Sequence, residues 1–232
     1  MNHTRIIVLI AILGIATTVG AAEVRTLSAE VESTALKAVR LEAGVGDVDV
    51  TVGGGSLIVA SVELRPRRGG LFSSLKAAEK QVQAIRLEPS VTGDTLVLTL
   101  KSVDEDRRFE EDWMLTLPSH LALSIELGVG DIEVSNASGG LDLELGVGDA
   151  TVQVIGGPVD IEVGVGDITV HGVSAAFRSV EIAAGVGDVR IIAEGRKITG
   201  EGFIAHSAEW RGSGDSDLDA ESGVGDIRVV LE

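Results

Sequence analysis

Apolar and polar residues alternate strictly over many short segments of the chain, which is typical of β-strands with one buried face. Segments 123–127, 141–145 and 159–163 show this period of two, as do 132–134 and 150–154. The apolar positions are mostly Leu, Ile and Val, which suit a pleated, half-buried surface. The pattern therefore predicts an all-β fold for most of the chain.

The tetrapeptide Gly-Val-Gly-Asp separates many of these strands and occurs six times. The middle copies are 18, 18 and 21 residues apart, and the last spacing is 38 residues. A period near 20 is typical of stacked repeats, so we expect a β-solenoid, a β-helix-like stack of two-strand coils with 18–21-residue repeats. The corner residues of these coils are Gly44, Gly46, Asp47, Gly128, Gly130, Asp131, Gly146, Gly148, Asp149, Gly164, Gly166, Asp167, Gly185, Gly187, Asp188, Gly223, Gly225 and Asp226.

Each residue type in the tetrapeptide suits a tight corner. Glycine tolerates positive φ, so the chain can turn sharply there. We expect the valine to point inward and cover the end of the core. The aspartate can accept hydrogen bonds from backbone N–H groups that the corner leaves unpaired.

Two regions depart from the repeat. Apolar residues recur at helical spacing within 71–85, which predicts one short amphipathic helix after the basic run 65–68. The coil between the last two Gly-Val-Gly-Asp copies is less regular, and residues 195–212 within it are predicted to form a protruding loop that carries His206 and Trp210. Trp210 is then the better candidate for contact with a partner, whereas Trp113 is expected to pack inside.

The first residues have the order of a secretory signal, with Arg5, an apolar stretch over 6–19 and small residues at 20–22. We expect cleavage after Ala22, which leaves residues 23–232 as a single domain with irregular insertions near 65–90 and 195–212. The apolar stretch is about 14 residues, shorter than the roughly 20 of a membrane-spanning helix. No stable membrane anchor is therefore expected after cleavage, and the protein is expected in the periplasm, at the cell surface or outside the cell.

Composition limits the partners. The chain has a net charge of −17, which repels nucleic acid and anionic lipid and attracts cationic proteins or polymers. Cysteine is absent from the sequence, so stability must come from burial and backbone hydrogen bonds without disulfides. At 44% hydrophobic residues, the chain can bury a core despite its charge.

Carboxylates recur at fixed positions before the corners. By alternation these side chains face outward and stack from coil to coil, together with the corner aspartates. Calcium, which prefers six to eight oxygen ligands, is one way to offset their repulsion, with Asp131, Asp149, Asp167 and Asp188 as candidates. Backbone donors, salt and water are the other. The rows are Glu42, Glu126, Glu144, Glu162 and Glu221, with Asp142, Asp160, Glu181 and Asp219 two residues further back.

Enzymatic interpretations have little support in the sequence. Gly-Val-Gly-Asp lacks the lysine of a phosphate-binding loop and the third glycine of a dinucleotide site. The carboxylates repeat uniformly, so no pair stands out as a glycosidase site. We expect no catalytic residues and no cofactor.

From Trp113 onward the chain resembles a bacterial family of exported proteins known as putative adhesins. The resemblance rests on the strand 113–117, Pro118, the strand 121–127, and Gly-Asp-Ile at 130–132, 166–168 and 225–227. It covers roughly residues 35–232. The family implies a β-solenoid at the envelope or cell surface and carries no catalytic residues to transfer.

Three functions remain open after these arguments: an envelope scaffold or interaction module, a calcium-stabilised β-roll-like surface protein, and a glycan-acting enzyme. The first is favoured, with an envelope protein or polymer as the partner. The last strand, 227–231, is expected to end the stack with an uncovered edge, which would allow self-association through it.

Overall fold

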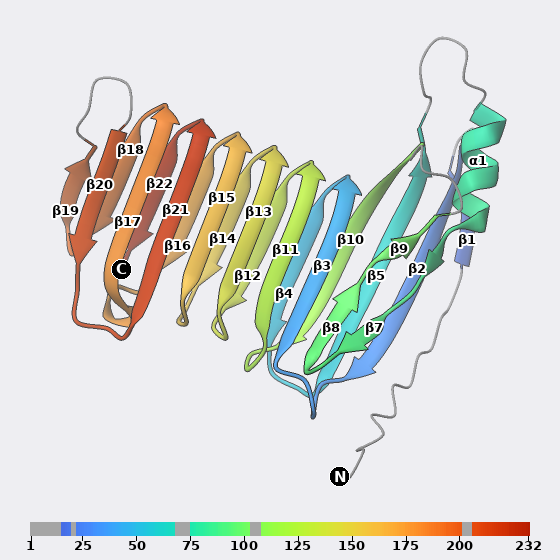
Figure 1. Cartoon of the computed structure of the whole chain (residues 1–232), viewed down its shortest axis with the longest axis horizontal. Helices are drawn as coiled ribbons and strands as arrows, with labels where there is room; N and C mark the ends of the chain where they lie inside the picture. The colour runs from blue at the N-terminus through green and yellow to red at the C-terminus, as the bar shows by residue number, and fades with distance from the viewer. Residues whose placement is uncertain (1–14, 20–21, 68–74, 103–107, 201–205) are drawn as a thin grey trace.

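The computed structural model describes residues 15–19, 22–67, 75–102, 108–200 and 206–232. These residues form an elongated body of two large β-sheets, with one α-helix at one end (Figure 1). The predicted all-β fold with one short helix is confirmed. Within these ranges, no helix is long and apolar enough to cross a membrane.

One sheet has eleven strands. Their spatial order is β1 (Ile15–Val19), β2 (Ala22–Glu32), β5 (Leu57–Pro66), β10 (Phe109–Pro118), β4 (Val48–Gly53), β12 (Ile132–Ala137), β14 (Ala150–Val154), β16 (Ile168–Gly172), β22 (Ile227–Leu231), β18 (Val189–Ala193) and β19 (Arg196–Thr199).

The other sheet has nine strands. They follow the order β20 (His206–Arg211), β17 (Phe177–Val186), β21 (Ser216–Val224), β15 (Val159–Val165), β13 (Leu141–Val147), β11 (Ala122–Val129), β3 (Ala38–Val45), β8 (Thr95–Leu98) and β7 (Ser90–Thr92). A separate pair joins β6 (Arg86–Leu87) to β9 (Leu100–Lys101), and Ser174–Ala176 form a 3₁₀ turn.

Six repeat units each give one strand to each sheet, and a Gly-Val-Gly-Asp corner joins the two strands. Neighbouring units pair in parallel and in register in both sheets, as β13 with β15 and β14 with β16. Other strands pair in antiparallel fashion, including β2 with β5, β19 with β18 and β20 with β17, whereas β8 and β10 lie parallel to β3 and β4. The sheets are therefore mixed, and the prediction of a uniform stack of coils is not confirmed.

The units do not follow one another in chain order. Strands β21 and β22, from the last unit, lie between the unit of β15 and β16 and the unit of β17 and β18 (Figure 1). Both edges of β22 are thus hydrogen-bonded to neighbours. The expectation that Ile227–Leu231 ends the stack as an open edge is wrong, so it gives no basis for self-association through that strand.

The core lies between the two sheets and consists of stacked aliphatic rows. Ile125, Leu143, Ile161, Ala220 and Ile182 occupy equivalent positions on adjacent strands, and each is at most 2% exposed. The strict alternation of the sequence places these side chains inward and the carboxylates between them outward. Burial of such rows is the main source of stability in a chain without disulfides.

Helix α1 (Leu75–Ala84) covers the end of the core near β2 and β5. Ala78, Val82 and Ile85 are fully buried, which confirms the apolar face predicted within 71–85; residues 71–74 lie outside the described ranges. The Arg25 side chain donates hydrogen bonds from Nη1 to the backbone oxygens of Val82, Gln83 and Ile85 at 2.8–3.0 Å. These bonds satisfy carbonyls that the helix end leaves unpaired.

The predicted loop at 195–212 is largely wrong, although residues 201–205 lie outside the described ranges. Arg196–Thr199 form β19 and His206–Arg211 form β20, which pairs with β17. Trp210 is 9% exposed and opposes Val180, so it packs into the core and is not a partner-contact residue. The predicted packing role of Trp113, at 1% exposed, is confirmed.

Candidate interaction surface

The corner aspartates form one continuous hydrogen-bonded row. The Oδ1 atom of each aspartate accepts a hydrogen bond from the backbone N–H of the aspartate in the next unit, at 2.7–3.0 Å. The predicted role of Asp at the corner is confirmed, and the donor comes from the neighbouring unit. In spatial order this aspartate row is Asp47, Asp131, Asp149, Asp167, Asp226 and Asp188.

The second glycine of each corner is required by the close spacing of the units. Gly148 has φ +139° and donates its N–H to the Val165 oxygen at 2.9 Å. A Cβ atom at this position would overlap the backbone oxygen of Gly130 in the adjacent unit. The corner therefore excludes side chains for two independent reasons, backbone conformation and contact with its neighbour.

The corner valines are exposed, which contradicts the expectation that they point into the core. Val129, Val147, Val165, Val224 and Val186 are 45–59% exposed and lie at equivalent positions on adjacent strands. Alternation would place Val147 on the same face as Leu145, but the regular pattern ends at the corner, and the last two residues of β13, Gly146 and Val147, are both exposed. The chain then turns outward at the corner. We call these five residues the valine row.

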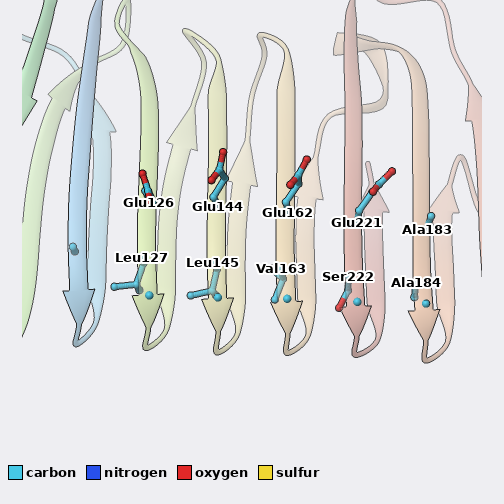
Figure 2. Close-up of a pocket in the computed structure, with 16 residues that line it drawn as sticks. Glu126, Leu127, Glu144, Leu145, Glu162, Val163, Ala183, Ala184, Glu221 and Ser222 are labelled. Carbon is cyan, nitrogen blue, oxygen red and sulfur yellow. The ribbon is translucent and has the colours of Figure 1, made fainter.

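Glutamates form a further row on the outer face of the nine-stranded sheet. Figure 2 shows Glu126, Glu144, Glu162 and Glu221 on adjacent strands, with their side chains on the same face. The register pairs each with the next, and Glu42 continues the row beyond Glu126. This predicted outward stacking is confirmed. A second acidic row two residues back contains Asp142, Asp160, Asp219 and Glu181.

A shallow groove of about 730 Å³ runs along the corners of this sheet (Figure 2). Its lining includes four glutamates of the row and the first glycines of the corners, such as Gly146 and Gly164. Because these glycines carry no side chain, space is left between the glutamate row and the valine row. Around the corners that end β11, β13, β15 and β21 the order is therefore glutamate row, glycine floor, valine row and aspartate row.

The outer face of the eleven-stranded sheet has a different character. Its equivalent positions include Thr151, Thr169, Gln153 and His171, with Arg228 and Arg190 on the next two strands. The row of Thr151 continues through Glu133 to Asp49 on β12 and β4, so this face carries both signs of charge, whereas the outward rows described above on the nine-stranded sheet are acidic. A cationic partner would be attracted to that side.

Asp219 carries the strongest sign of repulsion within the acidic rows. Burial raises the pKa of its carboxyl above the ordinary 3.8, and the neighbouring Glu181 and Asp160 carboxylates raise it further. Because the pKa is higher in the folded state, the fold gains stability as the pH falls through that pKa and loses it as the pH rises.

We therefore expect Asp219→Asn to raise the melting temperature at pH 7, since the variant removes an unfavourable charge. The gain should shrink as the pH falls towards 3.8, where the native carboxyl also becomes neutral. Melting followed by circular dichroism at stepped pH values measures this. A gain of equal size at every pH would contradict the assigned cause.

The calcium candidates Asp131, Asp149, Asp167 and Asp188 all belong to the aspartate row. The first three use Oδ1 to accept an N–H from the next unit. Within the described residues, no group of three or more His, Asp or Glu side chains is placed to hold a metal ion. Backbone donors are thus the observed means of offsetting the charge of these carboxylates.

We expect equal melting temperatures in EDTA, in millimolar calcium and in millimolar magnesium, because the aspartates serve the corners themselves. Circular dichroism in the three buffers measures this. A calcium-specific rise of many degrees, absent with magnesium, would instead demonstrate sites in the folded state.

Sequence reasoning missed the start of the aspartate row. Asp112 on β10 accepts the N–H of Asp47 at 3.2 Å, and Glu111 accepts the N–H of Gly44 at 2.5 Å. Glu111 is 1% exposed and also accepts a hydrogen bond from Trp113 Nε1 at 3.3 Å. Glu111 and Asp112 thus provide acceptors to the first corner, where no repeat unit precedes it in the stack. The only signal was an acidic pair next to a tryptophan.

No protein-family model and no curated protein matches this chain. Among solved structures, a protein from Clostridium sporogenes, named a putative cell adhesion protein, is similar with a TM-score of 0.58. The two share 19% sequence identity over 89% of this chain and 99% of the other. This match shows the fold.

A protein from Bacteroides fragilis, named a putative adhesin, is 16% identical over 88% of this chain and 96% of its own. Its TM-score is 0.32, which is too low to show a shared fold. At these identities the comparisons concern architecture alone and assign no residue a role.

Proposed function

We propose that the protein is a non-catalytic, exported interaction module of the cell envelope. The observation that carries this proposal is the long periodic surface on the nine-stranded sheet and its corners, where glutamate, valine and aspartate rows repeat from unit to unit. Such a surface suits an extended partner that contacts many units at once. The partner is an envelope protein or polymer with positive charge.

Export and an envelope location are supported by the charge, apolar stretch and small residues at the start of the sequence. The similarity in fold to a protein named a putative cell adhesion protein is consistent with a surface role. The parallel, in-register units in the centre further support the description of that part as a β-solenoid, to which antiparallel strands have been added at both ends.

The non-catalytic part of the proposal rests on uniformity. Catalysis by carboxylates needs two groups in different environments, one proton donor and one base or nucleophile. Here Glu126, Glu144 and Glu162 each have a glutamate of the row on either side. The pKa of Asp219 is raised first by burial and then by neighbouring acids of the same kind, so it has no distinct partner group.

Cell fractionation and envelope binding test the proposal together. The tagged chain is expected outside the cytoplasm, and the purified protein is expected to bind isolated envelopes in a salt-dependent manner. A variant with Glu126, Glu144 and Glu162 changed to Gln should bind more weakly, because it removes charge from the glutamate row. Cytoplasmic retention, or envelope binding that neither salt nor this variant alters, would refute the proposal.

A further inference from the structure

The valine row is an exposed apolar stripe with acidic residues along both sides. Val129, Val147, Val165, Val224 and Val186 follow one another on neighbouring strands, each about half exposed. The arrowheads of the five strands that carry them lie side by side along one edge of the body (Figure 1). A single exposed valine needs no explanation, but an aligned row of five does.

Like charge disfavours a second copy of this chain as the occupant. Two valine rows placed face to face would bring two aspartate rows and two glutamate rows together, in molecules of net charge −17. A partner with apolar residues along one line and positive charges on both sides would instead match the surface in polarity and in sign.

The spacing of the row favours a helix over a strand. Neighbouring strands are about 4.8 Å apart, so the valines repeat at that interval. Residues on one face of an α-helix repeat every turn, about 5.4 Å along the axis. Residues on one face of a strand repeat at about 6.6–6.8 Å. The apolar side chains of a helix therefore stay aligned with three or four successive valines, whereas those of a strand lose alignment after one or two.

We propose that the valine row binds a basic amphipathic α-helix of a partner protein, which lies along the row across several units. The apolar face of the helix packs on the valines. Its Lys or Arg side chains reach the glutamate row across the glycine-floored groove on one side and the aspartate row on the other. This rests on the proposed interaction function and specifies the class of partner.

The direct test uses two synthetic 18-residue peptides of identical Leu and Lys composition. One has Leu at helical spacing, and the other alternates Leu and Lys strictly, as in a strand. Fluorescence anisotropy with the full chain is expected to show about tenfold tighter binding of the helical peptide. Equal affinity for both peptides, or binding of neither, would overturn the proposal.

Variants then locate the site. Changing Val129, Val147 and Val165 to Ser is expected to weaken binding of the helical peptide about tenfold, because three half-buried contacts are lost. Ile155→Ser is the matched control, since Ile155 is 50% exposed and lies away from the row at the end of β14. Unchanged affinity in the triple variant, or an equal loss with Ile155→Ser, would contradict the assignment.

The triple Glu→Gln variant provides a second measurement that does not alter the apolar row. It should also weaken peptide binding, and raised salt should reduce the difference between it and the native chain. If both peptides fail to bind while the protein still binds envelopes in a salt-dependent manner, the helix proposal is wrong and the interaction function stands.

Discussion

Gly148→Ala is expected to lower the free energy of unfolding by about 3–5 kcal/mol. Gly148 has φ +139°, and its added Cβ would overlap the Gly130 oxygen of the neighbouring unit. The backbone cannot retreat, because the Gly148 N–H is bonded to Val165 on the other side. Denaturant unfolding measures the change.

The matched control is Gly156→Ala, in the same repeat but at the opposite corner. A Cβ there would meet nothing within 4 Å. The control is therefore expected to change stability by less than about 1 kcal/mol, and a gain is as acceptable as a loss. Equal losses in the two variants would show that the close approach of the units is not what requires glycine.

Glu111→Ala is expected to cost about 3 kcal/mol, since it leaves one buried and one partly buried donor without their acceptor. These donors are the N–H of Gly44 and Nε1 of Trp113, and the residue itself is 1% exposed. Thermal and denaturant unfolding measure the loss. Trp113 fluorescence should also change, because its indole loses a hydrogen bond.

Glu111→Gln separates hydrogen bonding from packing in this prediction. The amide keeps the shape and one acceptor oxygen, so a loss of about 1–2 kcal/mol is expected. If Gln is as harmful as Ala, the negative charge itself matters more than the acceptor geometry. If neither variant is destabilised, the assigned role of Glu111 at the start of the aspartate row is wrong.

The sequence predicted local structure well where a single physical rule applied. Alternation identified the strands and the outward glutamates, and the hydrogen-bonding capacity of aspartate identified its role at the corner. Helical spacing within 71–85 identified α1. Each of these conclusions depends only on neighbouring residues and their preferences.

The errors arose where the outcome depends on how units meet. Alternation places Val147 on the same face as Leu145, inside, but the regular strand pattern ends at the corner and leaves Val147 exposed. Trp210 was assigned to a loop because the repeat is less regular there, and pairing with β17 gives it a buried position. Glu111 could not be found, since its partner Gly44 is 67 residues away.

The spatial order of the repeat units also could not be predicted from the sequence. All six corners are identical, so any unit can pair with any other in register, and local preference does not select among the arrangements. The choice is made by the connections and by unlike side chains at matching positions. One such difference is Ala183, which lies opposite Glu221 and ends the glutamate row.

The position of β21 and β22 has a consequence for assembly during synthesis. Residues 177–193 are made before residues 216–231, yet they pack against them and not against the earlier unit at 159–172. The strands β17 and β18 therefore reach their final neighbours only after β21 and β22 have been synthesised and have paired with β15 and β16. A chain cut short before residue 216 therefore lacks an inner layer of the body and not merely a tip.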